Sequence, residues 1–346
     1  MRMPVKVFGG RWERIGQLEQ GGQGVIYLVK DLRDPQGGTA ALKRLKNIQR
    51  LDRFSKEIRA LKGLDAPDIV RILDENPEPP EPYLVMEYCS HGNLEKRALQ
   101  QWKRKPLESI SRILCIFERI CAAVGKAHKA GITHRDLKPA NILFRDDSDS
   151  PVVADFGLCY LDDDDSRLTI CEEAVGPRWY MAPELESGRA KNVNPRSDVY
   201  SLGKLLYWML SPGNVFSREV HREQEWNLIG LLNEPALEHV NVLLDRMIVV
   251  DPAKRYSDAS EVAVAGAETN RLIKGGFRVI STKIQQRCTY CGIGYYKPVP
   301  DPYNFGIQTN YAGAKWRIVA CNHCGHVQLF RLDLAEDSNV WDRDTD

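Results

Sequence analysis

The spacing of apolar and polar residues predicts a small β-rich region followed by a larger helical one. Between residues 12 and 90, short apolar runs alternate with turns, and one strong helical stretch covers residues 51–62. Further along the chain a helical period dominates, and it is clearest over residues 110–128, 199–209 and 240–249. The chain is therefore expected to fold as two lobes, the first built on a sheet and the second on helices.

Two other segments interrupt this pattern. Residues 74–82, DENPEPPEP, are acidic and rich in proline, which predicts a surface loop between two strands. After Gly275 and Gly276 the pattern returns to short strands and turns, so we place a domain boundary near residues 272–280. The expected parts are an N-terminal extension (1–11), a main domain (12–272) with lobes at about 12–89 and 90–272, a small β module (278–334) and an acidic tail (335–346).

The bulk composition fits a globular protein and singles out no partner. Of the 346 residues, 43% are hydrophobic and 27% are charged, and the formal net charge is +1. The small module holds seven basic and two acidic residues, a net charge of +5, and the tail holds five acidic residues and one basic, a net charge of −4. A solvated module with a frayed tail would show the same modest asymmetry.

No part of the sequence predicts a membrane segment. The N-terminus lacks the apolar run of a signal peptide. The most apolar window, residues 199–210, is interrupted by Lys204 and is far shorter than the roughly 20 residues that span a bilayer. We therefore expect a cytoplasmic protein without a membrane partner, in which the nine cysteines are thiols or metal ligands rather than disulfides.

A glycine cluster and a lysine in the β-rich region are the first chemical signals. In EQGGQGVIY, residues 19–27, glycines permit a tight turn whose N–H groups could cradle phosphates, although a plain hairpin also explains the cluster. Lys43 lies in a predicted strand of small and apolar residues, where its ammonium needs a counter-charge. Glu57, fourteen residues further on in the predicted helix, can supply that charge. Taken alone, the pair could also be a structural salt bridge.

The segment ITHRDLKPANIL, residues 132–143, carries the strongest chemical signal. Asp136 can accept the proton of an attacking hydroxyl, Lys138 can neutralise charge on a phosphoryl group in transfer, and Asn141 can hold a divalent cation. Nineteen residues after Asp136 comes VADFGL, in which Asp155 follows a β-branched run and suits a carboxylate that coordinates Mg²⁺. A purely structural role does not account for both segments together.

With these motifs in this order and at this spacing, the chain resembles the eukaryotic-like (Hanks-type) protein kinases over about residues 12–270. The resemblance implies an α+β fold, the bilobal protein-kinase fold with a β-rich N-lobe and a helical C-lobe, followed here by the small β module. It implies ATP and Mg²⁺ (or Mn²⁺) as cofactors and protein hydroxyls as acceptors. Lys138 belongs to the serine/threonine version of the catalytic segment, which favours serine and threonine over tyrosine as acceptors.

The resemblance also assigns roles to individual residues. Its catalytic residues here are Lys43, Glu57, Asp136, Lys138, Asn141 and Asp155. Its ATP-binding residues are Gly21, Gly22, Gly24, Ile26, Ala41, Lys43, Met86, Glu87, Cys89, Leu143 and Asp155. Among these, Asp136 is implied to be the catalytic base, and Asn141 and Asp155 to hold Mg²⁺. Met86 is implied to be the gatekeeper in front of the hinge Glu87–Cys89, which would meet adenine, and the adenine ring would lie between Ile26, Ala41 and Leu143. Asp198, Glu184 and Arg255 match scaffold positions of the family.

Two positions depart from the family pattern. Glu19 stands where the phosphate loop usually has its first glycine, which could weaken ATP binding. Pro177 replaces a threonine that usually bonds near the catalytic residues, so peptide preference does not carry over. These departures keep a second interpretation open, in which the chain is a pseudokinase that senses nucleotide and recruits a partner. In the activation segment, Thr169 and Ser166 are the candidate phosphorylation sites, with Arg135 as the phosphate-binding residue.

The C-terminal module predicts a structural zinc site. CTYCG and CNHCG are two C-x-x-C-G turns separated by twenty-nine residues, and such a pair of turns forms a tetrahedral site. The expected Zn²⁺ ligands are Cys288, Cys291, Cys321 and Cys324, with His323 and His326 as alternatives. The module resembles a zinc ribbon, and a docking role toward another protein is favoured over contact with nucleic acid.

Overall fold

The structure of the chain is a computed structural model. It describes residues 6–21, 24–45, 58, 62–64, 66–78, 80–101, 106–156, 179–186, 194–211, 214–275, 296–298, 316–321, 324 and 327–331. The chain divides into two compact units, Met1–Phe277 and Arg278–Asp346. Within the described ranges, no helix is both long and apolar enough to cross a membrane.

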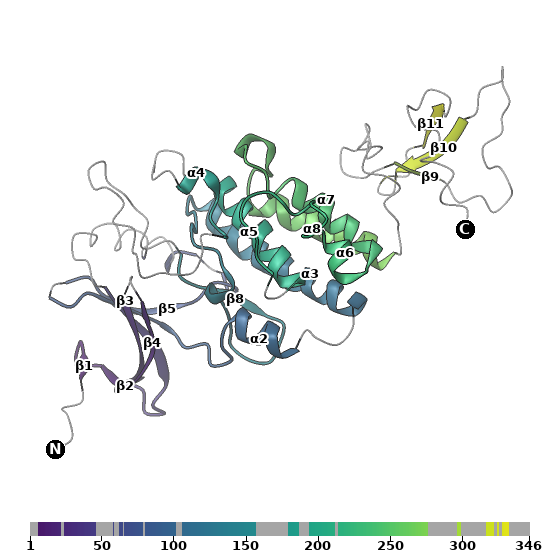
Figure 1. The fold of residues 1–346 in the computed structure, drawn as a ribbon. Coiled ribbons are helices and arrows are strands. Elements are labelled where there is room, and N and C mark those ends of the chain that lie inside the picture. The colour runs from purple at the N-terminus through teal and green to yellow at the C-terminus, as the bar shows by residue number, and fades with distance from the viewer. Residues whose placement is uncertain are drawn as a thin grey trace. The chain divides into compact units, whose positions relative to one another are not determined.

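The first unit begins with an antiparallel sheet of six strands, in the order β1-β2-β3-β4-β6-β5 (Figure 1). The strands are β1 (Val7–Phe8), β2 (Trp12–Gly21), β3 (Gly24–Asp31), β4 (Thr39–Leu45), β5 (Ile72–Asn76) and β6 (Tyr83–Glu87). β2 and β3 form the hairpin of the glycine cluster, in which Gly21 pairs with Gly24. The β-rich first lobe is thus confirmed.

The two faces of this sheet carry different side chains, because successive residues of a strand point to opposite sides. One face holds a buried apolar cluster of Phe8, Trp12, Val29, Ala40, Leu42, Tyr83 and Val85. On the other face, Lys43 pairs in register with Ile26, and Ala41 pairs with Met86. Strand alternation therefore places Lys43 on the same side of the sheet as Ile26, Ala41 and Met86, all of which are predicted to bind ATP.

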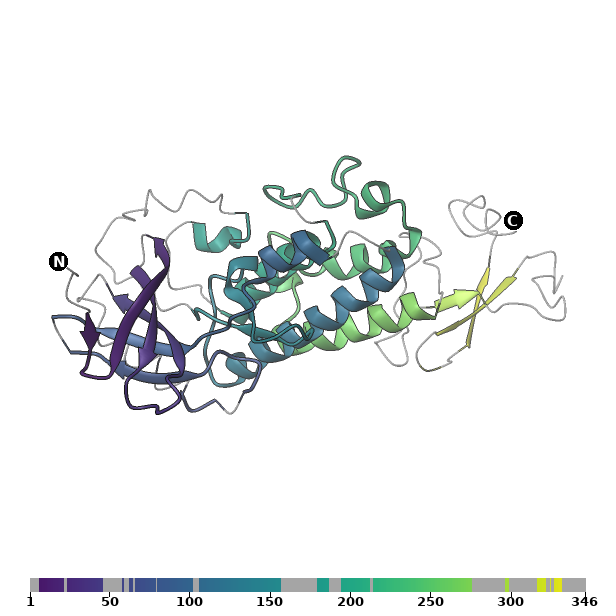
Figure 2. The same ribbon diagram turned by 90° about the horizontal axis from the view of Figure 1, so that it is seen from below.

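The second lobe is helical, which confirms the expected α+β architecture. Its helices are α2 (Leu94–Gln101), α3 (Pro106–Lys129), α4 (Pro183–Glu186), α5 (Pro195–Leu210), α6 (Leu228–Leu232), α7 (Glu238–Asp245) and α8 (Ala259–Lys274). The short turns η2 (Pro139–Asn141), η4 (Pro235–Leu237) and η5 (Pro252–Lys254) and the hairpin β7 (Ile142–Phe144) and β8 (Pro151–Val153) complete it. Figures 1 and 2 show α3 and α8 side by side, in agreement with their extensive contact.

Helix boundaries follow local capping groups. The Asn194 side chain accepts a hydrogen bond from the Arg196 N–H at the start of α5, and Pro195 occupies the first helical position. The Asp258 carboxylate accepts from the Ser260 and Glu261 N–H groups at the start of α8. These caps fix where α5 and α8 begin.

Two local predictions differ from the structure. The predicted helix 240–249 ends at Asp245, and the apolar residues Met247 and Ile248 that extended the pattern are buried in the core outside a helix. The loop predicted over residues 74–82 starts three residues later than expected, since β5 continues to Asn76. Asp74 accepts a hydrogen bond from Trp12 Nε1 at 2.7 Å, a tertiary contact that local composition does not reveal. Most of the predicted helix 51–62 lies outside the described residues.

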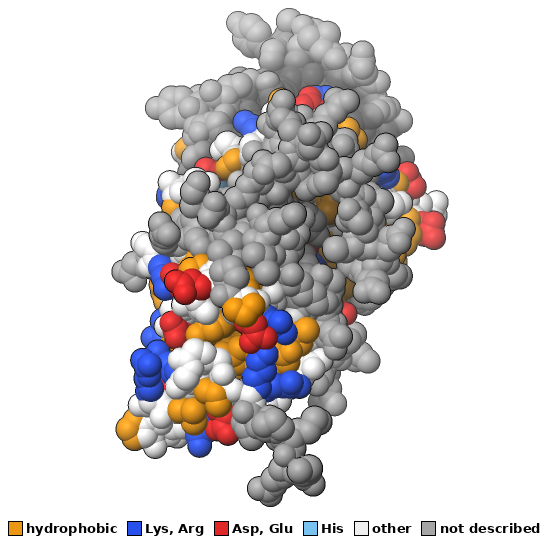
Figure 3. Space-filling model, turned by 90° about the vertical axis from the view of Figure 1, so that its left-hand side faces the viewer, with side chains coloured by type: hydrophobic (Ala, Val, Ile, Leu, Met, Phe, Trp, Pro, Cys, Tyr) orange, Lys and Arg blue, Asp and Glu red, His pale blue; other side chains and the backbone are white. Residues whose placement is uncertain are grey.

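The surface of the first lobe mixes charged and apolar groups. On the face seen in Figure 3, the coloured part of the surface shows basic, acidic and hydrophobic side chains interspersed. Among the described residues of this lobe, the exposed large apolar ones are Val7, Ile15, Leu18 and Leu32. Such single exposed residues are usual on a folded surface.

The second unit contains an antiparallel sheet in the order β11-β10-β9. Its strands are β9 (Tyr296–Pro298), β10 (Trp316–Cys321) and β11 (Val327–Arg331). Cys321 ends β10 and pairs in register with Tyr296, and Cys324 lies in the turn before β11. The predicted short strands of this module are therefore present around the second cysteine pair.

Candidate active site

Asp136 lies in the loop between α3 and β7, and two polar side chains converge on it. Lys138 Nζ donates to Asp136 Oδ2 at 2.8 Å, and Asn141 Nδ2 donates to the same oxygen at 3.1 Å. Asn141 Nδ2 also donates to the Asp136 backbone carbonyl at 2.7 Å. The turn η2 produces this convergence, because it brings Asn141 back over the residues that precede it. The three residues predicted for phosphoryl transfer therefore form one cluster.

The orientation of Asn141 suits it to hold a cation. Its amide nitrogen must face Asp136, since a backbone carbonyl can only accept a hydrogen bond. The side-chain oxygen consequently lies on the other side of the amide. An amide oxygen together with the carboxylate of Asp155 is a donor set that fits Mg²⁺, which prefers oxygen ligands.

Lys43 and Asp155 form an ion pair across the two lobes. Lys43 Nζ lies 2.8 Å from Asp155 Oδ1, and the Lys43 side chain is only 6% exposed. Burial by itself raises the pKa of Asp155, but the Lys43 ammonium outweighs it and holds that pKa below its ordinary value. Asp155 is therefore an anion near neutral pH, as a metal-binding carboxylate must be. Glu57, the predicted partner of Lys43, lies outside the described residues.

Asp198, on α5, holds the backbone of the catalytic loop just before Asp136. It is fully buried and accepts hydrogen bonds from the His134 N–H at 2.7 Å and the Arg135 N–H at 2.8 Å. Arg135 has φ of 68°, a left-handed conformation that is costly for a residue with a side chain. The carboxylate thus stabilises a strained backbone directly before Asp136.

His128 also contacts Asp198, and the sequence did not predict this role. Its Nδ1 accepts from the Ala259 N–H at 3.2 Å, so its Nε2 carries the proton that is donated to Asp198 at 2.8 Å. One imidazole therefore connects α8, α3 and α5 to the catalytic loop. Its sequence signal was only a histidine in the last turn of an amphipathic helix, and its partner is 70 positions away.

His134 is a second buried imidazole of the loop. Its Nε2 donates to the Ala154 carbonyl at 2.9 Å, and its Nδ1 accepts from the Asp136 N–H at 3.3 Å. Burial lowers the pKa of His134, although the nearby carboxylates oppose that shift. The residue therefore stays neutral and links the two segments that carry Asp136 and Asp155.

The predicted adenine side of the site lies at the end of β6. Met86 and Cys89 are buried, with exposed fractions of 5% and 7%, and Ala41 beside Met86 is 8% exposed. Burial first, and the charge of Glu87 second, raise the pKa of Cys89 to about 11, so its thiol is uncharged and behaves as an apolar group. Leu143, from β7, forms a β-bridge with Asn93, four residues after Cys89.

Other predicted residues fall partly or wholly outside the description. Gly22, Glu57, Ser166, Thr169, Pro177, Cys288 and Cys291 are not described. In the described part of the chain, no group of three or more histidine, cysteine, aspartate or glutamate residues is placed to hold a metal ion. Of the four predicted zinc ligands, that part contains only Cys321 and Cys324, so the zinc site stays a prediction.

The predicted scaffold pair is joined in the structure. Arg255 donates to Glu184 through Nη1 at 2.7 Å and Nη2 at 2.9 Å, and the Arg255 side chain is completely buried. A buried guanidinium needs such a bidentate partner. This pair ties α4, which contains Glu184, to the residue that follows the turn η5.

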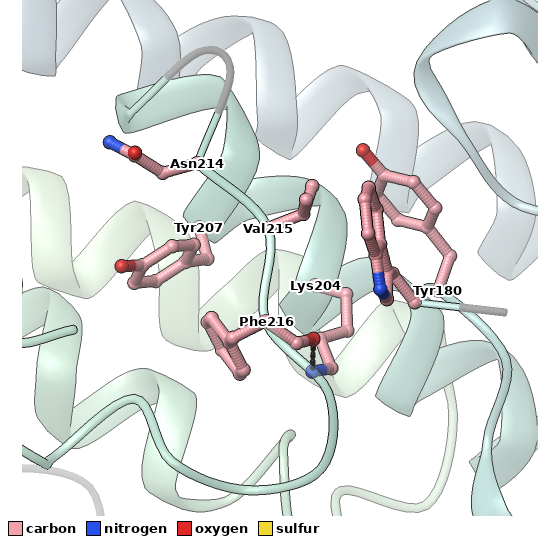
Figure 4. A pocket seen from close by; sticks show the side chains of 7 residues that line it. Tyr180, Lys204, Tyr207, Asn214, Val215 and Phe216 are labelled. Carbon is pink, nitrogen blue, oxygen red and sulfur yellow. Dashed lines mark hydrogen bonds between the residues drawn. The ribbon is translucent and has the colours of Figure 1, made fainter. Parts of the chain in front are cut away.

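A small pocket lies elsewhere in the helical lobe (Figure 4). It has an empty volume of about 170 Å³ and is lined by Trp179, Tyr180, Lys204, Tyr207, Asn214, Val215 and Phe216. Lys204 lies at its side, and Lys204 Nζ donates to the Phe216 carbonyl at 2.8 Å and the Arg218 carbonyl at 2.7 Å. None of the residues predicted to bind ATP lines this pocket.

Comparison with known protein families gives one match that covers most of the chain. Residues 12–265 match the family described as protein kinase domain. The matched segment runs from the first residue of β2 into α8 and contains every catalytic residue predicted above.

Curated relatives agree with this match. The serine/threonine-protein kinase Pkn1 of Myxococcus xanthus is 38% identical over 155 residues, which are 44% of this chain and 21% of that protein. The serine/threonine-protein kinase PknL of Mycobacterium tuberculosis is 32% identical over 198 residues, which are 55% of this chain and 48% of PknL. The alignments thus span less than half of these relatives.

Solved structures share the fold. A point mutant of the PknI kinase domain of Mycobacterium tuberculosis has a TM-score of 0.57 and 23% identity, and the match covers 78% of this chain and 99% of that one. Rad53 1-466 in complex with AMP-PNP has a TM-score of 0.56 and 26% identity, and the match covers 73% of this chain and 64% of that one.

Proposed function

We infer that this chain, which belongs to the protein kinase domain family, is a serine/threonine protein kinase that uses ATP and Mg²⁺. The observation that carries this function is the convergence of Lys138 and Asn141 on the Asp136 carboxylate. Relatives described as serine/threonine kinases support the same acceptor class as Lys138 does. The protein substrates, which include the chain itself, follow from the same proposal.

The geometry supports a division of labour among the residues. Asp136 would accept the proton of the attacking hydroxyl, and Lys138, beside it, would neutralise charge on the phosphoryl group in transfer. Asn141 and Asp155 would hold Mg²⁺, which when bound neutralises charge on the phosphates. Lys43 keeps Asp155 ionised and would meet the α- and β-phosphates. Catalysis of this kind rests mainly on positioning and charge.

We also propose where ATP is bound. The face of the sheet that carries Ile26, Ala41 and Met86, together with Leu143, would enclose adenine. The β2–β3 hairpin with Gly21, Gly22 and Gly24 would cover the phosphates, and Glu87 and Cys89 would present backbone groups to the base. This assignment is supported by the shared face of these strands with Lys43.

The test of the function is transfer of radiolabelled phosphate from ATP to the protein itself and to a general protein substrate. Asp136→Asn should lower the transfer rate by at least about 100-fold, because it removes the base. Binding of a fluorescent ATP analogue should change by less than about twofold, since the base contacts the acceptor rather than the nucleotide. Asp147→Asn, the same substitution on a carboxylate that is 92% exposed, is the matched control.

Two results would contradict the assignment. If the Asp136→Asn variant still labels substrate at the wild-type rate, Asp136 is not the catalytic base. A wild-type chain that binds nucleotide but transfers no phosphate would favour the pseudokinase interpretation instead.

For the second unit, we propose a structural zinc site of the ribbon type. Cys321 at the end of β10 and Cys324 in the following turn have the placement that a C-x-x-C turn between two strands requires. Cys288 and Cys291 would supply the other two thiolates. Thiolate ligands suit a reducing compartment, so a cytoplasmic location is part of this proposal. We assign the unit a protein partner rather than nucleic acid, because docking to another protein is a common role of such modules.

A further inference from the structure

Arg145, the residue directly after β7, reaches back to the end of β6. Its Nε donates to Glu87 Oε2 at 2.8 Å, and its Nη2 donates to Glu87 Oε1 at 2.7 Å. The two parallel bonds form a bidentate pair, in which the planar guanidinium fixes the direction of the carboxylate. The pair joins residues that are 58 positions apart in the chain, one from each lobe.

The same guanidinium also holds the segment before β5. Arg145 Nη1 donates to the Pro67 carbonyl at 2.7 Å. Glu87 Oε1 in turn accepts from the Arg71 N–H at 2.7 Å, and the Glu87 N–H donates to the Arg71 carbonyl at 3.0 Å. Arg145 therefore ties the end of β7 to two places in the first lobe, Pro67 and the end of β6, and Glu87 at the end of β6 in turn holds Arg71.

The backbone of Arg145 adds a contact on the far side of the hinge. Its carbonyl accepts from His91 Nδ1 at 2.8 Å, and the His91 N–H donates to the Phe144 carbonyl at 3.2 Å. The short connection from Glu87 to His91 is thus held at its first residue by the Arg145 side chain and at its last residue by the Arg145 backbone. This connection contains Cys89, which is predicted to meet the base.

The electrostatics favour a fixed carboxylate. Burial alone raises the pKa of Glu87, but the hydrogen bonds from Arg145 and the Arg71 N–H outweigh it and hold that pKa below its ordinary value. The Glu87 side chain is 15% exposed and the Arg145 side chain is 38% exposed. A pair at this level of exposure adds little to global stability, so its effect is mainly on local geometry.

We propose that Arg145 is a positioning residue for adenine nucleotides, which sets nucleotide affinity by fixing the Glu87–Cys89 connection against Leu143. Leu143, the predicted floor under adenine, precedes Arg145 by two residues, about 7 Å along an extended strand. Arg145 thus links Leu143 to the Glu87–Cys89 connection without itself touching the nucleotide. The inference rests on the proposed ATP-dependent function and names a residue that the family resemblance does not assign.

The test compares two substitutions at this position in the full chain. Arg145→Gln removes the charge and one side of the fork, and Arg145→Lys keeps the charge but cannot form the bidentate pair. We expect the KM for ATP, and the Kd of a fluorescent ATP analogue, to rise roughly fivefold to tenfold in Arg145→Gln and about twofold in Arg145→Lys. The kcat should stay within about twofold of wild type in both, because the Asp136 cluster is unchanged.

A matched control exists on α8. Arg271 forms an equally bidentate pair with Glu268, with both bonds at 2.7 Å, far along the chain from the hinge. Arg271→Gln should leave the KM, the Kd and the kcat unchanged. Glu87→Gln should raise the Kd like Arg145→Gln, and the double variant should show little further loss, because both substitutions break one unit.

Direct nucleotide titration separates this inference from the proposed function. If the wild type binds the analogue and Arg145→Gln binds it equally well, the positioning role is wrong whereas the kinase function is untouched. If Arg145→Gln instead lowers kcat with an unchanged KM, the residue acts on the catalytic loop and the inference is also wrong. A wild-type chain that binds no adenine nucleotide overturns both proposals.

Discussion

Two residues of the active site have backbone conformations that their side chains disfavour. Arg135 has φ of 68° and Asp155 has φ of 57°, and each such left-handed residue costs about 1–3 kcal/mol. The Asp198 carboxylate holds the Arg135 N–H, and the Lys43 ammonium holds the Asp155 side chain. Arg135 directly precedes the predicted base Asp136, and Asp155 is itself a predicted Mg²⁺ ligand, so these two charged contacts hold strained backbone within the site.

The buried Lys204 predicts how the stability of the first unit depends on pH. Burial lowers its pKa to about 7, although Glu219 opposes the shift. An unfolded lysine has a pKa near 10.4, so between about pH 7 and pH 10 the unfolded chain binds a proton that the native chain does not. Stability should therefore rise with pH over this window, by at most about 1.4 kcal/mol per pH unit for one proton. We expect Lys204→Met to abolish that rise, measured as melting temperature from pH 6 to pH 9.5.

The control for Lys204→Met is the same substitution at a lysine whose side chain faces solvent. Lys126, on the exposed side of α3, is suitable, and Lys126→Met should keep the wild-type pH profile. Lys204 should also retain its two backbone bonds when neutral, since an amine still carries two N–H groups for the Phe216 and Arg218 carbonyls. A gap between wild type and Lys204→Met that stays constant over the pH range would show that Lys204 is charged throughout.

At this scale, spacing along the chain, without the family resemblance, found the residues whose partners are close in sequence. Asp136, Lys138 and Asn141 lie within six positions, so their convergence needs only one turn of backbone. Arg145 and His128 were missed, because their partners Glu87 and Asp198 are 58 and 70 positions away. An isolated arginine or histidine carries no local signal of such a partner.

At the scale of elements, α5 packs closely on the segment that follows α7. A Cβ atom at Gly203 would lie 2.8 Å from Met247 Cβ and 2.8 Å from Ile248 Cγ1. Glycine within a helix costs about 1 kcal/mol relative to alanine, so its presence in α5 is explained by the close approach. The contact seats α5, and with it Asp198, against the lobe core.

Gly203→Ala should therefore destabilise the first unit despite the gain in helix propensity. We expect the free energy of unfolding to fall by about 1–3 kcal/mol, the usual cost of overpacking, in chemical denaturation followed by circular dichroism. Gly266→Ala on α8 is the matched control, because its Cβ would lie 3.6 Å from Glu118 Cγ, an ordinary contact. That variant should gain up to about 1 kcal/mol. Equal stability of the two variants would show that α5 has room to shift.

The differences between predicted and observed elements have the same physical origin. Met247 and Ile248 extended the apolar pattern of α7 because they are buried, yet they are buried by α5 packing rather than by a continuing helix. Asp74 belongs to β5 although its neighbours suggest a loop, because its carboxylate meets Trp12 of β2. Local periodicity reports burial, and it cannot tell which element causes the burial.

At the scale of the whole molecule, the chain consists of two units with different sources of stability. The first unit has a large continuous apolar core built on α3, α5 and α8. In the second unit, Arg278–Asp346, the described structure is a sheet of three short strands. A unit of this size rarely holds itself together by apolar burial alone. The sequence could indicate this division, since the periodicity changes near Gly275, but it could not supply the partner of the second unit.

The proposed zinc site predicts that metal removal affects only the second unit. Metal binding to four thiolates contributes about 10–16 kcal/mol in small zinc domains, so without Zn²⁺ the unit should unfold. We expect about one zinc per chain by elemental analysis. In calorimetry, a zinc-selective chelator should abolish the separate transition of the second unit. The melting temperature of the first unit should stay within about 2 °C. Cys321→Ser and Cys324→Ser should reproduce the loss, whereas Cys115→Ser, on an exposed cysteine of α3, should not. A chain without zinc whose second unit still melts cooperatively would rule the site out, and a chelator that also lowers the melting of the first unit would show that the two units are coupled.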